Sequence, residues 1–148
     1  MNNFLVKHET NPLNKEFICG FISAEGCFSI VYHKKQNRFV PVFEIRVHVK
    51  DREILELIRD GIGLEEYRIH EYKRGKTHYL GLIIRRRSTI HDILIPYFTN
   101  YLHWAKKDQF EEWKNFIGIM DETNISHKLN QAVFENKRNS KLYETYRI

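Results

Sequence analysis

Hydrophobic and polar positions along this chain follow two different periods, and the period changes at turn residues. From Phe17 to Ala24, apolar residues recur at the spacing of one helix face, in Phe17, Ile18, Phe21 and Ile22. Strict alternation of apolar and polar residues then takes over, which is typical of a strand with one buried face. A helix is therefore expected to pass directly into a strand near Gly26.

The rest of the pattern predicts three further strands and three further core helices. The predicted strands are about Cys27–Lys35, Phe39–Val49, Tyr67–Lys73 and Thr77–Arg86. The predicted helices are about Pro12–Ala24 with Asn11 as N-cap, Asp51–Asp60, a short one that Ser88 or Thr89 caps and that Pro96 ends or kinks, and Ala105–Met120. Phe110, Trp113, Phe116 and Ile117 recur at helical spacing in the last of these helices, and they are expected in the core.

The order of these elements predicts an α+β domain with a four-stranded antiparallel sheet and helices on one face. In the second strand, Phe43, Ile45 and Val47 point one way, whereas Glu44, Arg46 and His48 point the other. The other face of the sheet is therefore expected to be polar and open. We expect one domain over residues 1–148, with a core at about 12–120 and a polar tail at 121–148. A helix at Ser126–Arg138 is expected in that tail, followed by frayed chain.

Composition adds a basic balance to this picture. The formal net charge is +5, and basic runs at Lys34–Lys35, Lys73–Lys76 and Arg85–Arg87 flank the predicted strands. Such a chain suits a polyanionic partner, although charge runs are more often only solvated. No apolar run has the length of a membrane span, and no secretory signal is visible. The two cysteines indicate a reducing, intracellular compartment, and the eight histidines show no paired metal-ligand spacing.

One acid stands at the end of the first predicted helix. Gly20 and Ala24 lie one turn apart on that helix and allow another backbone to approach closely, and Glu25 follows directly. A carboxylate at a helix C-terminus lies near the negative end of the dipole, which a cation would offset. Together with the last free carbonyls it offers oxygen ligands suited to Mg²⁺ or Ca²⁺. From the residues alone, an exposed Glu without a ligand remains the alternative.

The segment from Phe17 to Phe28, FICGFISAEGCF, resembles the signature of LAGLIDADG homing endonucleases in their organellar form. Gly20, Ala24, Glu25 and Gly26 match the signature, whereas Ser23 stands where an Asp is usual. The resemblance continues in pattern to about residue 120. It implies a LAGLIDADG-type αββαββα domain with a saddle-shaped sheet. It also implies a site-specific double-strand DNA endonuclease, encoded within an intron, that acts as a homodimer when a chain carries one signature.

The resemblance further implies roles for particular residues. The catalytic candidates are Glu25, Lys106 with Lys107 as the near alternative, and, at the end of the second strand, His48 or Lys50. Glu25 and the Gly26 carbonyl are the candidate ligands of Mg²⁺, in whose place Mn²⁺ or Ca²⁺ could bind. The predicted dimer interface comprises Phe17, Gly20, Phe21 and Ala24.

The open sheet face is expected to lie in the major groove of double-stranded DNA, which admits a β-ribbon. The predicted DNA-binding residues are Ser29, His33, Lys35, Arg38, Glu44, Arg46, Arg68 and His70. A two-fold dimer predicts a pseudo-palindromic site of about sixteen to twenty base pairs. Two alternatives stay open, a maturase that binds host intron RNA and a catalytically inactive sequence-specific DNA-binding protein. A mitochondrial, chloroplast, phage or bacterial origin also stays open.

Overall fold

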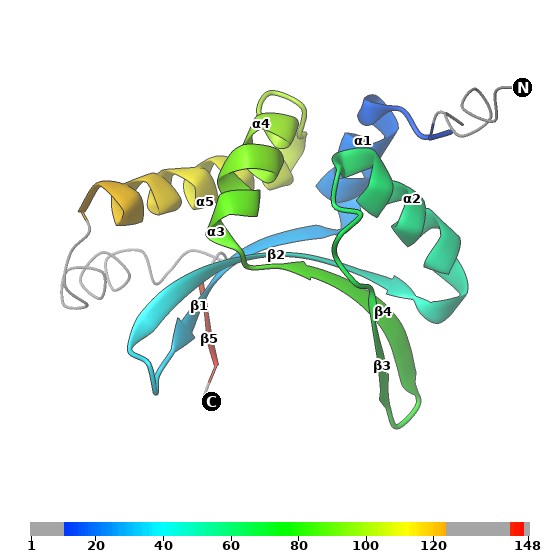
Figure 1. Cartoon of the computed structure of the whole chain (residues 1–148), viewed down its shortest axis with the longest axis horizontal. Helices are drawn as coiled ribbons and strands as arrows, with labels where there is room; N and C mark the ends of the chain where they lie inside the picture. Colours follow the sequence, from blue (N-terminus) through cyan, green and yellow to red (C-terminus); the bar gives the residue numbers. More distant parts are fainter. Residues whose placement is uncertain (1–10, 124–142, 147–148) are drawn as a thin grey trace, which may run out of the picture.

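In the computed structural model, which describes residues 11–123 and the strand at 143–146, a curved sheet carries helices on its convex side (Figure 1). The first half of the chain forms α1 (Lys15–Glu25), β1 (Gly26–His33), β2 (Arg38–His48), the short η1 (Val49–Asp51) and α2 (Arg52–Ile62). The second half forms β3 (His70–Arg74), β4 (Thr77–Ile84), α3 (Arg87–Thr89), η2 (Ile90–Leu94), α4 (Ile95–Phe98), α5 (Trp104–Thr123) and β5 (Tyr143–Tyr146). The concave side carries no helix in the described part of the chain.

The sheet has the order β3-β4-β2-β1-β5. The first four of these strands pair antiparallel, which confirms the predicted α+β architecture. The prediction of frayed chain after Arg138 is wrong, because β5 pairs in parallel with Ile30–His33 of β1. The helix predicted at Ser126–Arg138 lies outside the described residues. The structure describes no helix that is both long enough and apolar enough to cross a membrane.

The core lies between the convex face of the sheet and the helices, and Phe28 of β1 is at its centre. The Phe28 ring centroid lies 5.1 Å from those of Phe43 and Trp113 and 5.2 Å from that of Phe110. Phe98 meets the same ring edge-on at 5.6 Å. All five aromatic side chains are buried. These contacts confirm that the aromatic residues of α5 belong to the core, and they attach α5 to the first residues of β1.

Two predicted helix starts are wrong. Asn14, not Asn11, caps α1, because its side chain accepts the Phe17 N–H at 2.8 Å. Asn11, in the segment before α1, instead donates to the Leu57 carbonyl of α2 at 2.7 Å, a long-range contact that local sequence does not specify. Neither Ser88 nor Thr89 caps the later helix, which already begins at Arg87. The Thr89 hydroxyl is within 2.5 Å of the Tyr67 hydroxyl.

Two strand and helix bounds also differ from the prediction. Strand β3 begins at His70 rather than Tyr67, because Tyr67 turns inward to Thr89 and leaves the strand direction. The helical segment continues two residues beyond Pro96 to Phe98. It accommodates the proline, which has no N–H to donate, by changing to a wider turn in which the Ile95 N–H donates to the Ile90 carbonyl.

Candidate active site and nucleic-acid interface

Glu25 is the last residue of α1, and its side chain is exposed. Among the described residues, none forms a hydrogen bond or ion pair with its carboxylate. The position is electrostatically unfavourable, since the last carbonyls of α1 already make this helix end negative. The exposed carboxylate, which has no hydrogen bond or ion pair among the described residues, is therefore a suitable ligand for a cation.

Gly26 joins α1 to β1 without any bend that requires glycine, because its φ of −70° and ψ of 153° are ordinary extended values. Its lack of a side chain matters for space instead. A Cβ at this position would lie 2.6 Å from Cγ2 and 2.8 Å from the carbonyl oxygen of Ile22. The Gly26 N–H donates to that same Ile22 carbonyl. A larger residue would therefore displace the strand, and Glu25 with it, from the helix end.

Lys106 of α5 is the lysine that reaches this helix end. Its Nζ donates a hydrogen bond to the Gly26 carbonyl, and its side chain is half-buried. Lys107 is exposed, and no side-chain hydrogen bond or ion pair joins it to α1 in the described part of the chain. Of the two candidates that the sequence left open, Lys106 therefore lies beside Glu25.

Two further side chains of α5 hold the start of β1 in the same way. Gln109 accepts the Phe28 N–H at 3.5 Å, and the Trp113 indole donates to the Ser29 carbonyl at 2.9 Å. Because Lys106, Gln109 and Trp113 are three and four residues apart, they project from one face of α5. One helix face thus fixes the four residues that follow the candidate catalytic carboxylate.

Ser23, the residue that departs from the signature, joins the last turn of α1 to the segment before α5. Its hydroxyl donates to the Cys19 carbonyl at 2.7 Å and accepts the His103 N–H at 3.1 Å. The segment before α5 is therefore attached to the last turn of α1. A serine suits this role because its hydroxyl both donates and accepts.

The donor set near Glu25 fits a divalent cation in part. Glu25 supplies a carboxylate oxygen, whereas the Gly26 carbonyl already accepts from the positively charged Lys106. The described residues contain no group of three or more His, Cys, Asp or Glu side chains that would hold a metal alone. One copy of this fold therefore presents a single acidic ligand and needs further oxygen ligands from elsewhere.

His48, the third catalytic candidate, lies on the concave face at the end of β2 and is exposed. Its Nδ1 accepts the Lys50 N–H at 3.1 Å and so caps η1. In the sheet register His48 is three residues beyond Ile45, the partner of Gly26. That separation corresponds to about 10 Å along the strand. No contact in the described structure brings His48 to Glu25 or Lys106.

The cysteine of α1 has no part in this chemistry. Cys19 is fully buried, and burial raises the pKa of its thiol to about 11. A thiol with that pKa remains protonated at neutral pH and is a poor nucleophile and metal ligand. This agrees with its expected role as a reduced core residue.

Helix α1 is apolar on both sides. Ile18, Cys19 and Ile22 face the core, whereas Phe17 remains 49% exposed. The four residues that the pattern placed on one helix face therefore divide between two sides, since Ile18 and Ile22 are buried while Phe17 is exposed and Phe21 is only partly buried. A Cβ added at Gly20 would meet nothing within 4 Å. We call Phe17, Gly20, Phe21 and Ala24 the motif-helix face.

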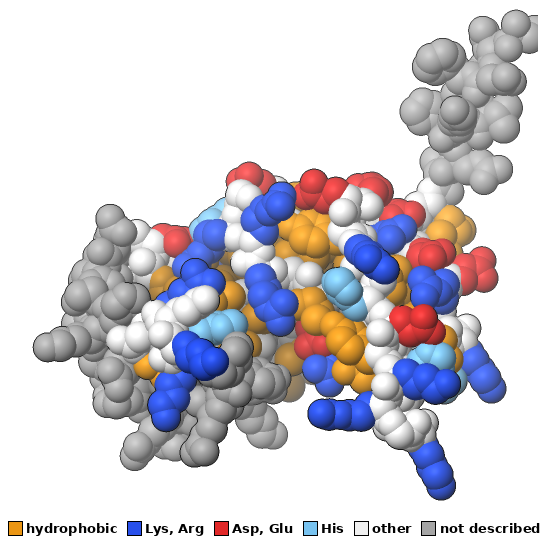
Figure 2. All heavy atoms as spheres, turned by 60° about the horizontal axis from the view of Figure 1, so that its bottom comes forward, with side chains coloured by type: hydrophobic (Ala, Val, Ile, Leu, Met, Phe, Trp, Pro, Cys, Tyr) orange, Lys and Arg blue, Asp and Glu red, His pale blue; other side chains and the backbone are white. Residues whose placement is uncertain are grey.

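The concave side of the sheet carries most of the predicted DNA-binding residues. By register, Ser29 and His33 of β1, Arg38, Glu44 and Arg46 of β2, and His70 of β3 all lie on this side. Figure 2 looks toward this side and shows hydrophobic side chains between Lys and Arg side chains. Lys35 lies in the β1–β2 turn, and Arg68 precedes β3 without joining the sheet.

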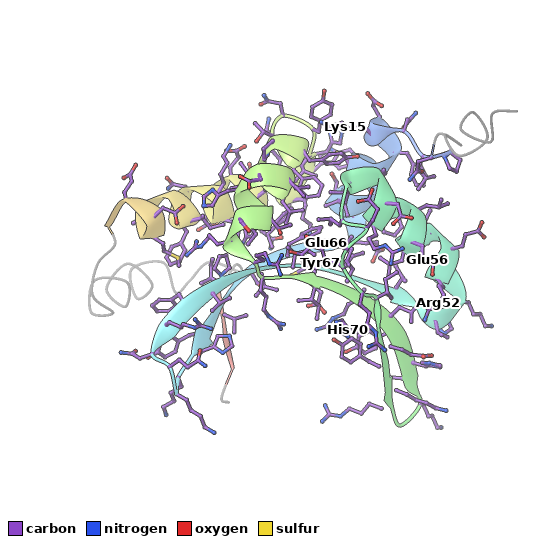
Figure 3. All side chains as sticks on the ribbon, in the orientation of Figure 1. Lys15, Arg52, Glu56, Glu66, Tyr67 and His70 are labelled. Carbon is purple, nitrogen blue, oxygen red and sulfur yellow. The ribbon has the colours of Figure 1, made fainter. Side chains whose placement is uncertain are left out.

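Several side-chain contacts fix the position of Arg46. Its Nε lies 2.6 Å from one Glu44 oxygen and its Nη2 lies 3.3 Å from the other. The guanidinium carbon lies 5.3 Å from the centre of the Tyr79 ring, and Tyr72 stacks on Tyr79 with centroids 4.8 Å apart. In Figure 3, His70 is labelled at the start of the strand that carries Tyr72. These contacts restrict Arg46 to one direction on the concave face.

The sequence analysis missed the apolar and aromatic members of this face. A hollow on the concave side is lined by four predicted residues, by the charged Arg85, and by five apolar or aromatic residues: Val31, Val42, Tyr72, Tyr79 and Ile83. The signal was present in β4, where burial of Leu80, Leu82 and Ile84 places Tyr79 and Ile83 on the other face. Alternation predicts polar side chains on a solvent-facing sheet surface, so apolar and aromatic side chains were not expected there.

Comparisons with known proteins agree with one another. The family model described as LAGLIDADG endonuclease matches residues 18–117. The protein named "Probable intron-encoded DNA endonuclease 1" from Mycosarcoma maydis is 35% identical over 104 residues, which cover 70% of this chain and 37% of that protein. The solved structure of the LAGLIDADG homing endonuclease I-GzeII in complex with its DNA target has a TM-score of 0.75 at 22% identity. The match covers 90% of this chain and 46% of the I-GzeII chain.

A second solved structure is that of I-SmaMI bound to an uncleaved DNA target in the presence of calcium ions. Its TM-score is 0.63 at 24% identity, and the match covers 76% of this chain and 39% of that one. The two structural likenesses establish the fold. This chain spans less than half the length of each of these three relatives.

Proposed function

Because the chain belongs to the LAGLIDADG endonuclease family, we propose that it is a site-specific double-strand DNA endonuclease encoded within an intron. The observation that carries the proposal is the arrangement at the start of β1. An exposed carboxylate, that of Glu25, directly precedes the strand that leads onto the concave face. Chemistry on phosphodiesters and contact with a duplex therefore meet at one junction.

We assign Glu25 as the ligand of a divalent cation, with Mg²⁺ as the physiological ion. Such an ion supplies Lewis-acid activation of water and of the phosphodiester. Lys106, with its ammonium beside Glu25, stabilises negative charge that develops on the phosphate. The Gly26 carbonyl serves as a second oxygen ligand only where Lys106 releases or shares it. His48 or Lys50 orients water from the end of β2.

One Glu25 serves one DNA strand, so double-strand cleavage needs a second copy of the fold. The motif-helix face supports an isologous dimer, since Phe17 is exposed and the space above Gly20 is open. Close packing of two such helices about a two-fold axis brings both carboxylates to one place. The expected site is a pseudo-palindrome of about sixteen to twenty base pairs.

The concave face lies along the major groove in this proposal. Its predicted contacts are those named above, from Ser29 to His70, with Lys35 and Arg68 reaching the flanking backbone. Arg side chains read guanine, and phosphates attract the basic turns.

The test is cleavage of a duplex library with randomised sequence, with Mg²⁺ and with EDTA. We expect the wild-type protein to cut a defined site only with the metal. Glu25→Gln should abolish cutting and retain binding, because the carboxylate is lost while the concave face is unchanged. Glu53→Gln, an exposed carboxylate at the start of α2, is the matched control and should cut normally.

Three results would overturn the proposal. Tight duplex binding without cleavage in any divalent metal would leave a catalytically inactive DNA-binding protein. Binding to intron RNA but to no duplex would indicate a maturase. Undiminished cleavage by Glu25→Gln would place the catalytic acid elsewhere.

A further inference from the structure

An apolar floor lies on the side of the sheet that faces away from the helices. Val31 of β1, Val42 of β2 and Ile83 of β4 form this floor, in a hollow of about 250 Å³. Val31 and Val42 are 7% and 3% exposed, and Ile83 is more open. Leu82 and Ile84, on either side of Ile83, are buried in the core and form the core-facing side of β4. The core therefore does not account for an apolar side chain at Ile83.

The walls of the hollow are polar and partly cationic. His33 and Arg85 line it together with the Arg46–Glu44 pair. The Arg46 guanidinium lies over the Tyr79 ring, and Tyr72 stacks on Tyr79. Gly81 leaves room for this stack, since a Cβ there would lie 3.0 Å from Cε2 of Tyr72. The hollow is thus a formed feature of the sheet, with cationic side chains at its border.

We propose that this hollow recognises the C5-methyl group of thymine in each half-site, with Val42 and Ile83 as the specificity-determining contacts. The inference rests on the proposed function and deepens it. Thymine is the only DNA base that presents an apolar group in the major groove. A water molecule takes about 30 Å³ of liquid volume, so the hollow admits a methyl group and the edge of its base. Cations at the border attract the phosphates on either side.

The experiment replaces single thymines by deoxyuridine, which removes only the methyl group. The duplex is the site recovered from the randomised library, and the readout is equilibrium binding of the full chain in Ca²⁺. We expect this replacement to weaken duplex binding about fourfold at one thymine, or at two adjacent thymines, of each half-site. A fourfold loss is the expected effect of one buried methyl group. Other thymine positions should show no change.

Matched variants identify the pocket. Ile83→Thr and Val42→Thr keep the β-branched shape and place a hydroxyl in the floor, so the preference for thymine over deoxyuridine should disappear at that position. Val40→Thr makes the same change on the same face, outside the lining of the hollow, and should keep the preference. Circular dichroism confirms folding, and Ile83→Thr is the decisive variant because its site is more open than that of Val42.

The possible failures are distinct. Absence of specific binding to any duplex would refute the proposed function. Specific binding that is insensitive to every deoxyuridine would refute the methyl pocket and leave the endonuclease proposal intact. A preference for thymine that survives in Ile83→Thr would also refute it, since the methyl group would then be read elsewhere.

Discussion

Lys106 donates from α5 to the residue that follows Glu25, across 80 positions of sequence. The contact places a positive charge at the negative end of α1 and partly offsets the dipole there. It also explains why two adjacent lysines of α5 are not equivalent. The side chain at 106 is half-buried beside β1, whereas that at 107 is exposed.

We predict that Lys106→Met lowers the cleavage rate about 100-fold, the usual cost of removing one charge-stabilising donor. Duplex affinity should change little, because the ammonium lies at the helix end and not on the concave face. Lys107→Met is the matched control and should cut within a few-fold of wild type. Single-turnover cleavage measures both. The reverse ranking would assign the role to Lys107.

Single residues of the site were predictable where a local pattern specifies them. Glu25 and Gly26 stand at the change from helical to alternating periodicity, so their place at the end of α1 follows from sequence. Contacts between distant segments determine the remaining features, which are the choice of Lys106 over Lys107, the role of Ser23 and the packing of Arg46 on Tyr79. No spacing within one element reveals such contacts.

Among the elements, α1 has the most unusual surface. A helix at the edge of a globular protein normally buries one apolar stripe and exposes a polar one. Here Ile18 and Ile22 fill the core while the motif-helix face stays apolar or small. An apolar outer stripe with open space above Gly20 is the expected form of a helix that packs against a second copy.

We predict that Gly20→Leu weakens self-association without destabilising the folded domain. A Cβ at this position meets no atom within 4 Å in one copy, and replacing a helical glycine gains roughly 0.5–1 kcal/mol. Between two copies the same side chain blocks close approach of the helices. Sedimentation equilibrium should show a lower association constant at an equal or higher melting temperature.

Gly118→Leu is the matched control for that prediction. Gly118 lies within α5, and a Cβ there also meets nothing within 4 Å. This variant should gain similar stability and associate like wild type. Equal loss of association in both variants, or in neither, would contradict an interface at the motif-helix face.

Most elements were predictable because their hydrophobic period is strong. The four antiparallel strands and α2, which ends at the left-handed Gly63, follow from alternation and turn residues. Strand β5 was missed because its pairing partner is more than a hundred residues earlier in the chain and its own segment shows no period. The widened turn before Pro96 was missed because the sequence shows that proline disturbs a helix but not how the helix adjusts.

At the scale of the whole molecule, basic turns stand at both ends of the arch. Lys35 lies in the β1–β2 turn and Arg74 at the end of β3, and both are exposed. Figure 1 shows these two hairpins curving down on either side of the concave face. A duplex on that face would pass between cationic tips, which suits contact with phosphates over the length of a half-site.

We predict that duplex affinity falls steeply with salt, with a slope of log K against log salt of about −0.9 for each phosphate contacted. Lys35→Gln and Arg74→Gln should each reduce that slope by about one, since each removes one phosphate contact. Arg52→Gln is the control, because Arg52 pairs with Glu56 on α2, on the side away from the concave face (Figure 3). Fluorescence anisotropy measures the series. A slope that the hairpin variants leave unchanged would contradict this docking.

The junction at Gly26 has a consequence for how such a protein changes over time. Glu25 and β1 belong to one continuous backbone, and α5 holds the first four residues of that strand. In the proposed enzyme this segment fixes the distance between the phosphodiester that is cut and the bases that the strand contacts. Substitutions on the concave face can therefore redirect the protein to new target sequences while the position of the cut within each target stays the same.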